Sequence, residues 1–335
     1  MAQRALLLGI LFAASCYKDG GSGGGTTPPP ANNNPAAVRG VDYSATIADP
    51  LGFLPVDSEI VLGLDVDQLR KSTFWPPIAA KLSSAGGSGL DTFKQVCNVD
   101  PMTSVRSVTL GVKNVKQSTP DGVMVVSGLD RVALMACMEK ATKTADSRTS
   151  IQNGIVVIAG AKSTGGTGLG ATAAGDGTVA FAFVDASTLV GVIGPTASRT
   201  QLQTVLAAGT PLRSSPAFSA LIKLTNLEAS LWTMMNGNSS VFDQAAGMLG
   251  SRPKAAFGSV NVTAGMSLDM RLRLDDAGRA TQLQQMINGQ VGMARAMFTK
   301  LDVTTDGADL VVSASMTDAQ ITQVLQLAGV SLNGP

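Results

Sequence analysis

Residues 255–274, AAFGSVNVTAGMSLDMRLRL, decide the fold class. Beyond Gly265, apolar side chains recur at every second position and alternate with polar or charged ones. These apolar residues are Met266, Leu268, Met270, Leu272 and Leu274. A period of two is typical of a strand with one buried face and one solvated face. The run 255–262 precedes it across Ala264-Gly265, so we predict an antiparallel hairpin with a buried apolar face.

The predicted elements around this hairpin occur in the same order in both halves of the chain. Each half contains a strand, a helix, a hairpin, a helix, a second hairpin and a helix. The second-half elements are a strand at 228–235, a helix at 241–249, the hairpin above, a helix after Asp275, a turn at Asp306-Gly307 and a helix after Thr317. Their first-half counterparts are a strand at 58–66, a short helix that opens at 67–69, a hairpin joining 105–115 to 123–129 through Asp121-Gly122, a helix capped by Asp130, a turn at Asn153-Gly154 and a helix after Ser198. We expect a Gly/Ser loop at 83–89.

The order strand–helix–strand–strand–helix–strand is that of ferredoxin-like units. We therefore predict an α+β fold of two tandem two-layer sandwiches, at 51–225 and 226–335. In each sandwich, helices cover one face of an antiparallel sheet. The sequence leaves open whether the two units share one continuous sheet.

The amino terminus has the layout of a secretory signal. Residues 1–16, MAQRALLLGILFAASC, combine Arg4, an apolar run and small residues before a cysteine. They resemble a bacterial lipoprotein signal, with Ala13-Ala14-Ser15 before the lipidation site Cys16. We predict a signal peptide at 1–15, a palmitate-type lipid anchor on Cys16, and a disordered Gly/Pro/Asn-rich tether at 16–50. The alternatives are a cleaved secretion signal without lipid and, less favoured, a buried core helix.

Four segments of the folded part resemble an uncharacterised family of myxobacterial-type lipoproteins. They are LPVDSEIVLGLDVDQLRKSTFW at 54–75, CNVDPMTSVRSVTLGV at 97–112, GLDRVALMACMEKA at 128–141 and FGSVNVTAGMSLDMRLRLDDAGRATQL at 257–283. They are packing and turn patterns rather than catalytic fingerprints. The resemblance implies a surface or periplasmic protein of the bacterial cell envelope with no assigned activity.

The composition excludes several classes of function. The net charge is +1 without a cluster of Lys or Arg, so the sequence predicts no nucleic-acid partner. The chain has no histidine, which removes the commonest general base and the commonest transition-metal ligand. We therefore predict no metal, no cofactor and no catalytic residue.

Cys97 and Cys137 remain as a pair once Cys16 carries lipid. In an oxidising compartment we expect these two to form a disulfide. Two buried free thiols are the alternative. A metal site is less favoured because the spacing is long and no histidine is available.

Several residues invite functional hypotheses, and each has a plainer interpretation that we favour. The Gly-rich segment 160–177 contains Lys162 and Ser163, yet its residue order differs from that of a phosphate-binding loop, and a surface loop is favoured. The acidic residues of the first strand, Asp57, Glu59, Asp65 and Asp67, are interpreted as a solvated strand face and a helix cap. The aromatic residues Phe74, Trp75 and Trp232 are interpreted as core or loop anchors. The polar strand face of Asp269, Arg271 and Arg273 is interpreted as a wet face or as the contact between halves.

These arguments predict a membrane-tethered, extracytoplasmic lipoprotein that acts as a non-enzymatic binding or interaction module. Its partners would be the membrane, through Cys16, and a protein or an apolar small molecule. The alternatives are a structural or assembly subunit of the envelope and, less favoured, an enzyme that uses Ser/Lys or carboxylate chemistry.

Overall fold

The computed structural model describes residues 49–117, 120–143, 148–159, 178–208, 212–292 and 294–327. The predicted signal peptide, Cys16, and the predicted tether up to residue 48 lie outside these residues, as do Lys162 and Ser163. Statements about them stay predictions.

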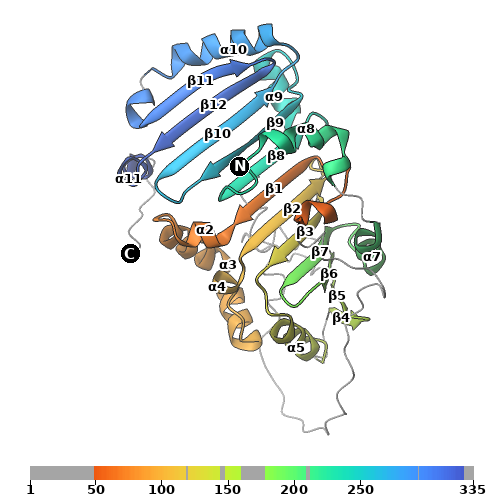
Figure 1. The fold of residues 1–335 in the computed structure, drawn as a ribbon. Helices are drawn as coiled ribbons and strands as arrows, with labels where there is room; N and C mark the ends of the chain where they lie inside the picture. The colour runs from red at the N-terminus through yellow and green to blue at the C-terminus, as the bar shows by residue number, and fades with distance from the viewer. Residues whose placement is uncertain are drawn as a thin grey trace.

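The described strands form one antiparallel sheet of 12 strands (Figure 1). The order across the sheet is β11-β12-β10-β9-β8-β1-β2-β3-β7-β6-β5-β4, and every neighbouring pair is antiparallel. The strands are β1 (Ile60–Asp65), β2 (Ser107–Lys113), β3 (Asp121–Ser127), β4 (Thr149–Gln152), β5 (Ile155–Ile158), β6 (Thr178–Phe183), β7 (Thr188–Gly194), β8 (Leu231–Asn236), β9 (Ala255–Asn261), β10 (Met266–Arg273), β11 (Lys300–Asp306) and β12 (Asp309–Met316).

Helices pack on both faces of this sheet. The α-helices are α2 (Val66–Arg70), α3 (Trp75–Cys97), α4 (Pro101–Ser104), α5 (Arg131–Ala141), α7 (Arg199–Ala208), α8 (Pro216–Leu224), α9 (Val241–Leu249), α10 (Ala277–Gln290) and α11 (Asp318–Leu327). The short 3₁₀ turns are η3 (Pro50–Phe53), η4 (Leu212–Ser214) and η5 (Ala294–Met297). On one face, side chains of η3, α7, η4 and α8 form a core with Val61, Val125, Val192 and Phe257. We call this the α8 face and the opposite one the α3 face.

The α3 face has two separate cores. In the N-terminal half, side chains of α3 and α5 pack on Leu110, Met124 and Phe181. In the C-terminal half, α10 packs on Leu272, Val303 and Leu310 at the outer strands of the sheet. Side chains of β3 are buried at six consecutive positions, because both faces of that strand are covered.

The strand order repeats about the central β1·β8 pair. It reads β1-β2-β3-β7-β6 in one direction and β8-β9-β10-β12-β11 in the other. Ile60 and Leu231 are the first residues of β1 and β8, and we treat them as equivalent. Following the pairing registers outward from them, the first residue of β2 corresponds to the first residue of β9. In the same way, the first residues of β7 and β6 correspond to those of β12 and β11. The two halves thus share one register, and the β4–β5 hairpin extends the sheet in the first half alone.

The prediction of ferredoxin-like units was wrong. In a ferredoxin-like unit the two strands joined by a split β-α-β crossover run in the same direction and are separated by another strand of the antiparallel sheet. Here the helical connection from β1 returns the chain antiparallel to it as β2, and β8 is connected to β9 in the same way. The expected covering of one face alone was also wrong, because helices pack on both.

The expected loop at 83–89 lies inside α3, a continuous helix of 23 residues. Glycine costs about 1 kcal/mol relative to alanine inside a helix, so local propensity argues against this helix. Its two ends are anchored in the core through Trp75, Phe93 and Cys97. Asn98 then ends it in a left-handed conformation and donates its N–H to the carbonyl of Lys94. Tertiary packing therefore overrides the local preference.

Candidate functional site

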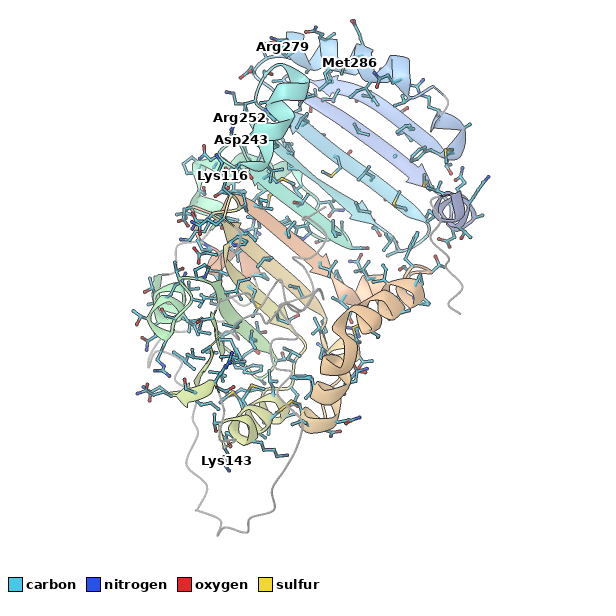
Figure 2. All side chains as sticks on the ribbon, turned by 180° about the vertical axis from the view of Figure 1, so that it is seen from behind. Lys116, Lys143, Asp243, Arg252, Arg279 and Met286 are labelled. Carbon is cyan, nitrogen blue, oxygen red and sulfur yellow. A yellow bond between two sulfur atoms is a disulfide. The ribbon has the colours of Figure 1, made fainter. Side chains whose placement is uncertain are left out.

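An open apolar surface lies on the α3 face of the C-terminal half. It consists of Leu231, Met235, Val260, Leu268 and Met270, which come from β8, β9 and β10. Leu231 lies opposite Val260 and Val260 opposite Leu268, so these side chains are neighbours on one face. All five are partly exposed, and none belongs to a core of the described residues. Figure 2 looks onto this face, where strands lie open between α9 and α10 on one side and α3 and α11 on the other.

The open apolar surface exists because the connection between β8 and β9 is short. In the first half, α2, α3 and α4 join β1 to β2, and α3 covers the sheet. The corresponding connection in the second half contains only α9, a helix of nine residues. In the repeat, Met270 corresponds to Met124 of β3, whose side chain is 4% exposed beneath the N-terminal helices. The same position is therefore core in one half and surface in the other.

Gly258 lies on β9 within the open apolar surface, opposite Met270. A Cβ atom at Gly258 would lie 2.7 Å from the Sδ atom of Met270 and 2.1 Å from the backbone oxygen of Asp269. The glycine therefore allows close approach of β10 and of the methionine side chain. Methionine is flexible and adapts to partners of different shape.

The alternation at 266–274 was only half correct as a guide to burial. The hairpin and its polar face are confirmed, but Leu268, Met270 and Leu272 are partly exposed and Leu274 alone is a fully buried member of the series. The helix after Asp275 ends at Gln290, covers the outer strands, and leaves Met286 51% exposed. Periodicity identified the apolar side of the strand but not whether a helix covers it.

The polar side of β10 is the wet face that the sequence suggested. Arg273 makes a two-point ion pair with Asp309, with Nε–Oδ1 at 2.7 Å and the second contact at 2.8 Å. Its guanidinium lies 5.3 Å from the ring centre of Phe257. Arg271 pairs with Asp306 at 2.9 Å. These charges have partners within the sheet and need no ligand.

The acidic residues near β1 each have a separate structural partner. Asp65 accepts the N–H of Gln68 at 2.8 Å and caps α2. Asp67 pairs with Arg70 and Asp57 with Lys113, both at 3.1 Å, while Glu59 accepts the N–H of Asn114 at 2.7 Å. The part of the chain that the structure describes holds no group of these side chains that could bind a metal ion. The helix start expected at Asp67 lies one residue earlier: Asp65 is the cap, and Asp67 lies in the first turn of α2.

A polar pocket of about 360 Å³ lies between the end of β2 and the start of α9. Lys116, Asp243 and Arg252 line it (Figure 2). Asp243 contacts Lys116 at 3.1 Å and also pairs with Arg252, and hydrogen bonds from these two cations lower the pKa of its carboxyl. Arg252 further donates to the carbonyl oxygens at 237 and 239. These contacts connect α9 to its neighbouring loops, and they give the pocket a structural role.

Cys97 and Cys137 lie at disulfide distance, with 4.8 Å between their Cα atoms. This separation falls in the usual range for a disulfide. Both side chains are buried, and they connect the end of α3 to the middle of α5. The geometry fits the predicted bond.

The two tryptophans act as anchors. Trp232 is 6% exposed and belongs to the core of the α8 face. Trp75 begins α3 and packs against the opposite core.

The sequence analysis did not identify the open apolar surface because its residues alternate like those of a buried strand. The brevity of the 241–249 helix, compared with the long segment between 66 and 105, was the signal that could have revealed it.

No protein-family model matches this chain, and neither a curated protein nor a solved structure is significantly similar to it. Among the described residues, no helix is long and apolar enough to span a membrane.

Proposed function

We propose that this chain is a non-enzymatic binding protein of the bacterial cell envelope, attached to a membrane by a lipid on Cys16. The open apolar surface is the observation that carries the binding function. Large contiguous apolar patches on a protein surface commonly mark interaction sites. The signal-like residues 1–16 and the Cys97–Cys137 pair support a location outside the cytoplasm.

The polar chemistry of the described residues supports a binding role rather than catalysis. The charged side chains of the pocket pair with one another, and the acidic residues near β1 cap or pair locally. General acid–base catalysis needs a titratable group held within hydrogen-bond reach of a substrate. Here the polar pocket uses its charges to hold α9.

The test measures lipidation and membrane association of the full chain. We expect labelled palmitate to be incorporated in a bacterium that processes lipoproteins, and the protein to fractionate with membranes. Cys16→Ser should abolish both. A protein recovered from the cytoplasm with its initiator methionine and no lipid would overturn the location, whatever the open apolar surface binds.

A further inference from the structure

We propose that the open apolar surface binds an amphipathic α-helix of a partner protein, in the position that α3 takes in the N-terminal half. This inference rests on the proposed function and names the class of its partner. Within the described residues, the repeated sheet occurs once with its covering helix and once without it.

The covered half shows what this sheet geometry accepts. Beneath α3 and α5, Leu110, Val112 and Met124 are at most 4% exposed. In the repeat, these three residues correspond, in the same order, to Gly258, Val260 and Met270 in the open apolar surface. Since β2 and β9 have seven residues each, and β3 and β10 share a register with seven and eight residues, a helix that packs on one set fits the spacing of the other.

The five residues of the open apolar surface are aliphatic or methionine. Thr233, between Leu231 and Met235 on β8, is buried and donates its hydroxyl to the carbonyl of Val61. The partner helix therefore needs apolar residues at i, i+3 or i+4, and i+7.

The chain does not supply this helix from the corresponding connection. The nine residues of α9 fill that connection, and α10 packs on the outer strands around Val303. α3 is held in its own half by the Cys97–Cys137 contact, so its exchange with a second copy would break that connection. A partner from outside is therefore the occupant that the geometry favours.

The shape of the surface favours a helix over an acyl chain. Sites for apolar small molecules enclose most of the ligand surface. The five residues here lie on the broad face of three strands, with α9 and α10 on one side and α3 and α11 on the other (Figure 2). An apolar sheet face that is broad rather than enclosed suits the apolar side of an amphipathic helix.

The experiment replaces Met270 with a photo-crosslinking amino acid in the full chain, which is produced in the native bacterium and crosslinked in its envelope. We expect an adduct with a different protein, and mass spectrometry should map it to a segment with helical apolar periodicity. A synthetic peptide of that segment should bind the purified chain and gain helicity on binding. Leu268→Glu should weaken this binding at least about tenfold, because the partner would bury an unpaired carboxylate.

The matched control is Ser267→Glu, which adds the same charge to the neighbouring, exposed residue on the opposite face. It should leave the adduct yield and peptide affinity unchanged. A crosslinker moved from Met270 to exposed Thr304 on the edge strand β11 should give no adduct. An adduct with lipid, with a second copy of the chain, or with an extended segment would reject the partner helix as the occupant. It would still be consistent with a binding function. A crosslinker at Met270 that captures nothing would overturn both, whereas failure of Cys16 lipidation alone would affect only the location.

Discussion

The indole ring of Trp232 occupies the space that a side chain at Gly63 would take. The two residues face each other in the β1·β8 pair at the centre of the sheet. A Cβ atom at Gly63 would lie 2.0 Å from Cε2 of Trp232, far inside van der Waals contact. The β1·β8 pair, which we call the seam between the two halves, is thus packed on the α8 face by one aromatic ring that lies over one glycine.

Gly63→Ala should lower the free energy of unfolding by about 1–3 kcal/mol, because the added methyl group overpacks the seam. Urea denaturation followed by tryptophan fluorescence measures this change. Gly247→Ala in α9 is the control, since nothing lies within 4 Å of a Cβ atom there. This control should stabilise the protein by roughly 0.5–1 kcal/mol through helix propensity. An unchanged midpoint for Gly63→Ala would contradict the packing described.

Asp121 should make stability depend on acid pH. Burial raises the pKa of Asp121, but hydrogen bonds from Thr196 and Asn114 together outweigh it and place the pKa below its ordinary value of 3.8. A lowered folded pKa stabilises the fold above pH 3.8, and this contribution is lost as pH falls through the folded value.

Asp121→Asn should therefore be less stable than the parent at pH 7, with a difference that shrinks as pH falls below about 4. Chemical denaturation at a series of pH values gives the two curves. Exposed Asp57, in a surface ion pair with Lys113, offers the comparison Asp57→Asn. Parallel curves for Asp121→Asn and the parent would show that its hydrogen bonds do not stabilise the ionised form.

The contact between Cys97 and Cys137 should behave as a structural disulfide. Thiol counting on the unfolded, non-reduced protein should leave both cysteines unreactive. Reduction should cost roughly 4 kcal/mol in the chain-entropy model for a loop of 40 residues. The double variant Cys97→Ala/Cys137→Ala should lose its response to reductant. Two reactive thiols in the untreated protein would exclude the bond.

The ion pair of Arg273 with Asp309 should contribute more to stability than an exposed pair. The Asp309 side chain is only 6% exposed, so Asp309→Asn leaves a guanidinium without its carboxylate and should cost about 1–3 kcal/mol. Lys300 and Asp302 form an exposed pair at 3.2 Å on the neighbouring edge strand. Asp302→Asn should change stability by less than about 0.5 kcal/mol. Equal effects in calorimetry would reject the difference in burial as the cause.

Local chemistry allowed much of the element order to be predicted. The helix at 241–249 coincides with α9, and Asp130 caps α5 by accepting the N–H of Ala133 at 2.7 Å. Asn153 and Gly154, both at positive φ, turn the β4–β5 hairpin as predicted. The turn predicted at Asp121-Gly122 was displaced, because both residues belong to β3 and the connection precedes them.

Strand pairing and coverage could not be predicted, because they depend on contacts between distant residues. The turn at Gly307 joins β11 to β12, whose counterparts are β6 and β7 rather than the β4–β5 hairpin. The continuous apolar run of β3 indicated burial on both faces, which the two-layer prediction did not use. The candidate site could not be predicted for the same reason: Met124 and Met270 both lie on strands, and among the described residues a helix covers only Met124.

The β1·β8 seam also bears on how the protein can exist at all. Each of these strands has six residues and would become a bare sheet edge if its half stood alone. A bare edge recruits other strands, including those of its own kind. Because one polypeptide contains both halves, β1 and β8 are always present in equal numbers and at very high local concentration. Each strand can therefore pair its edge with the other without meeting a second molecule.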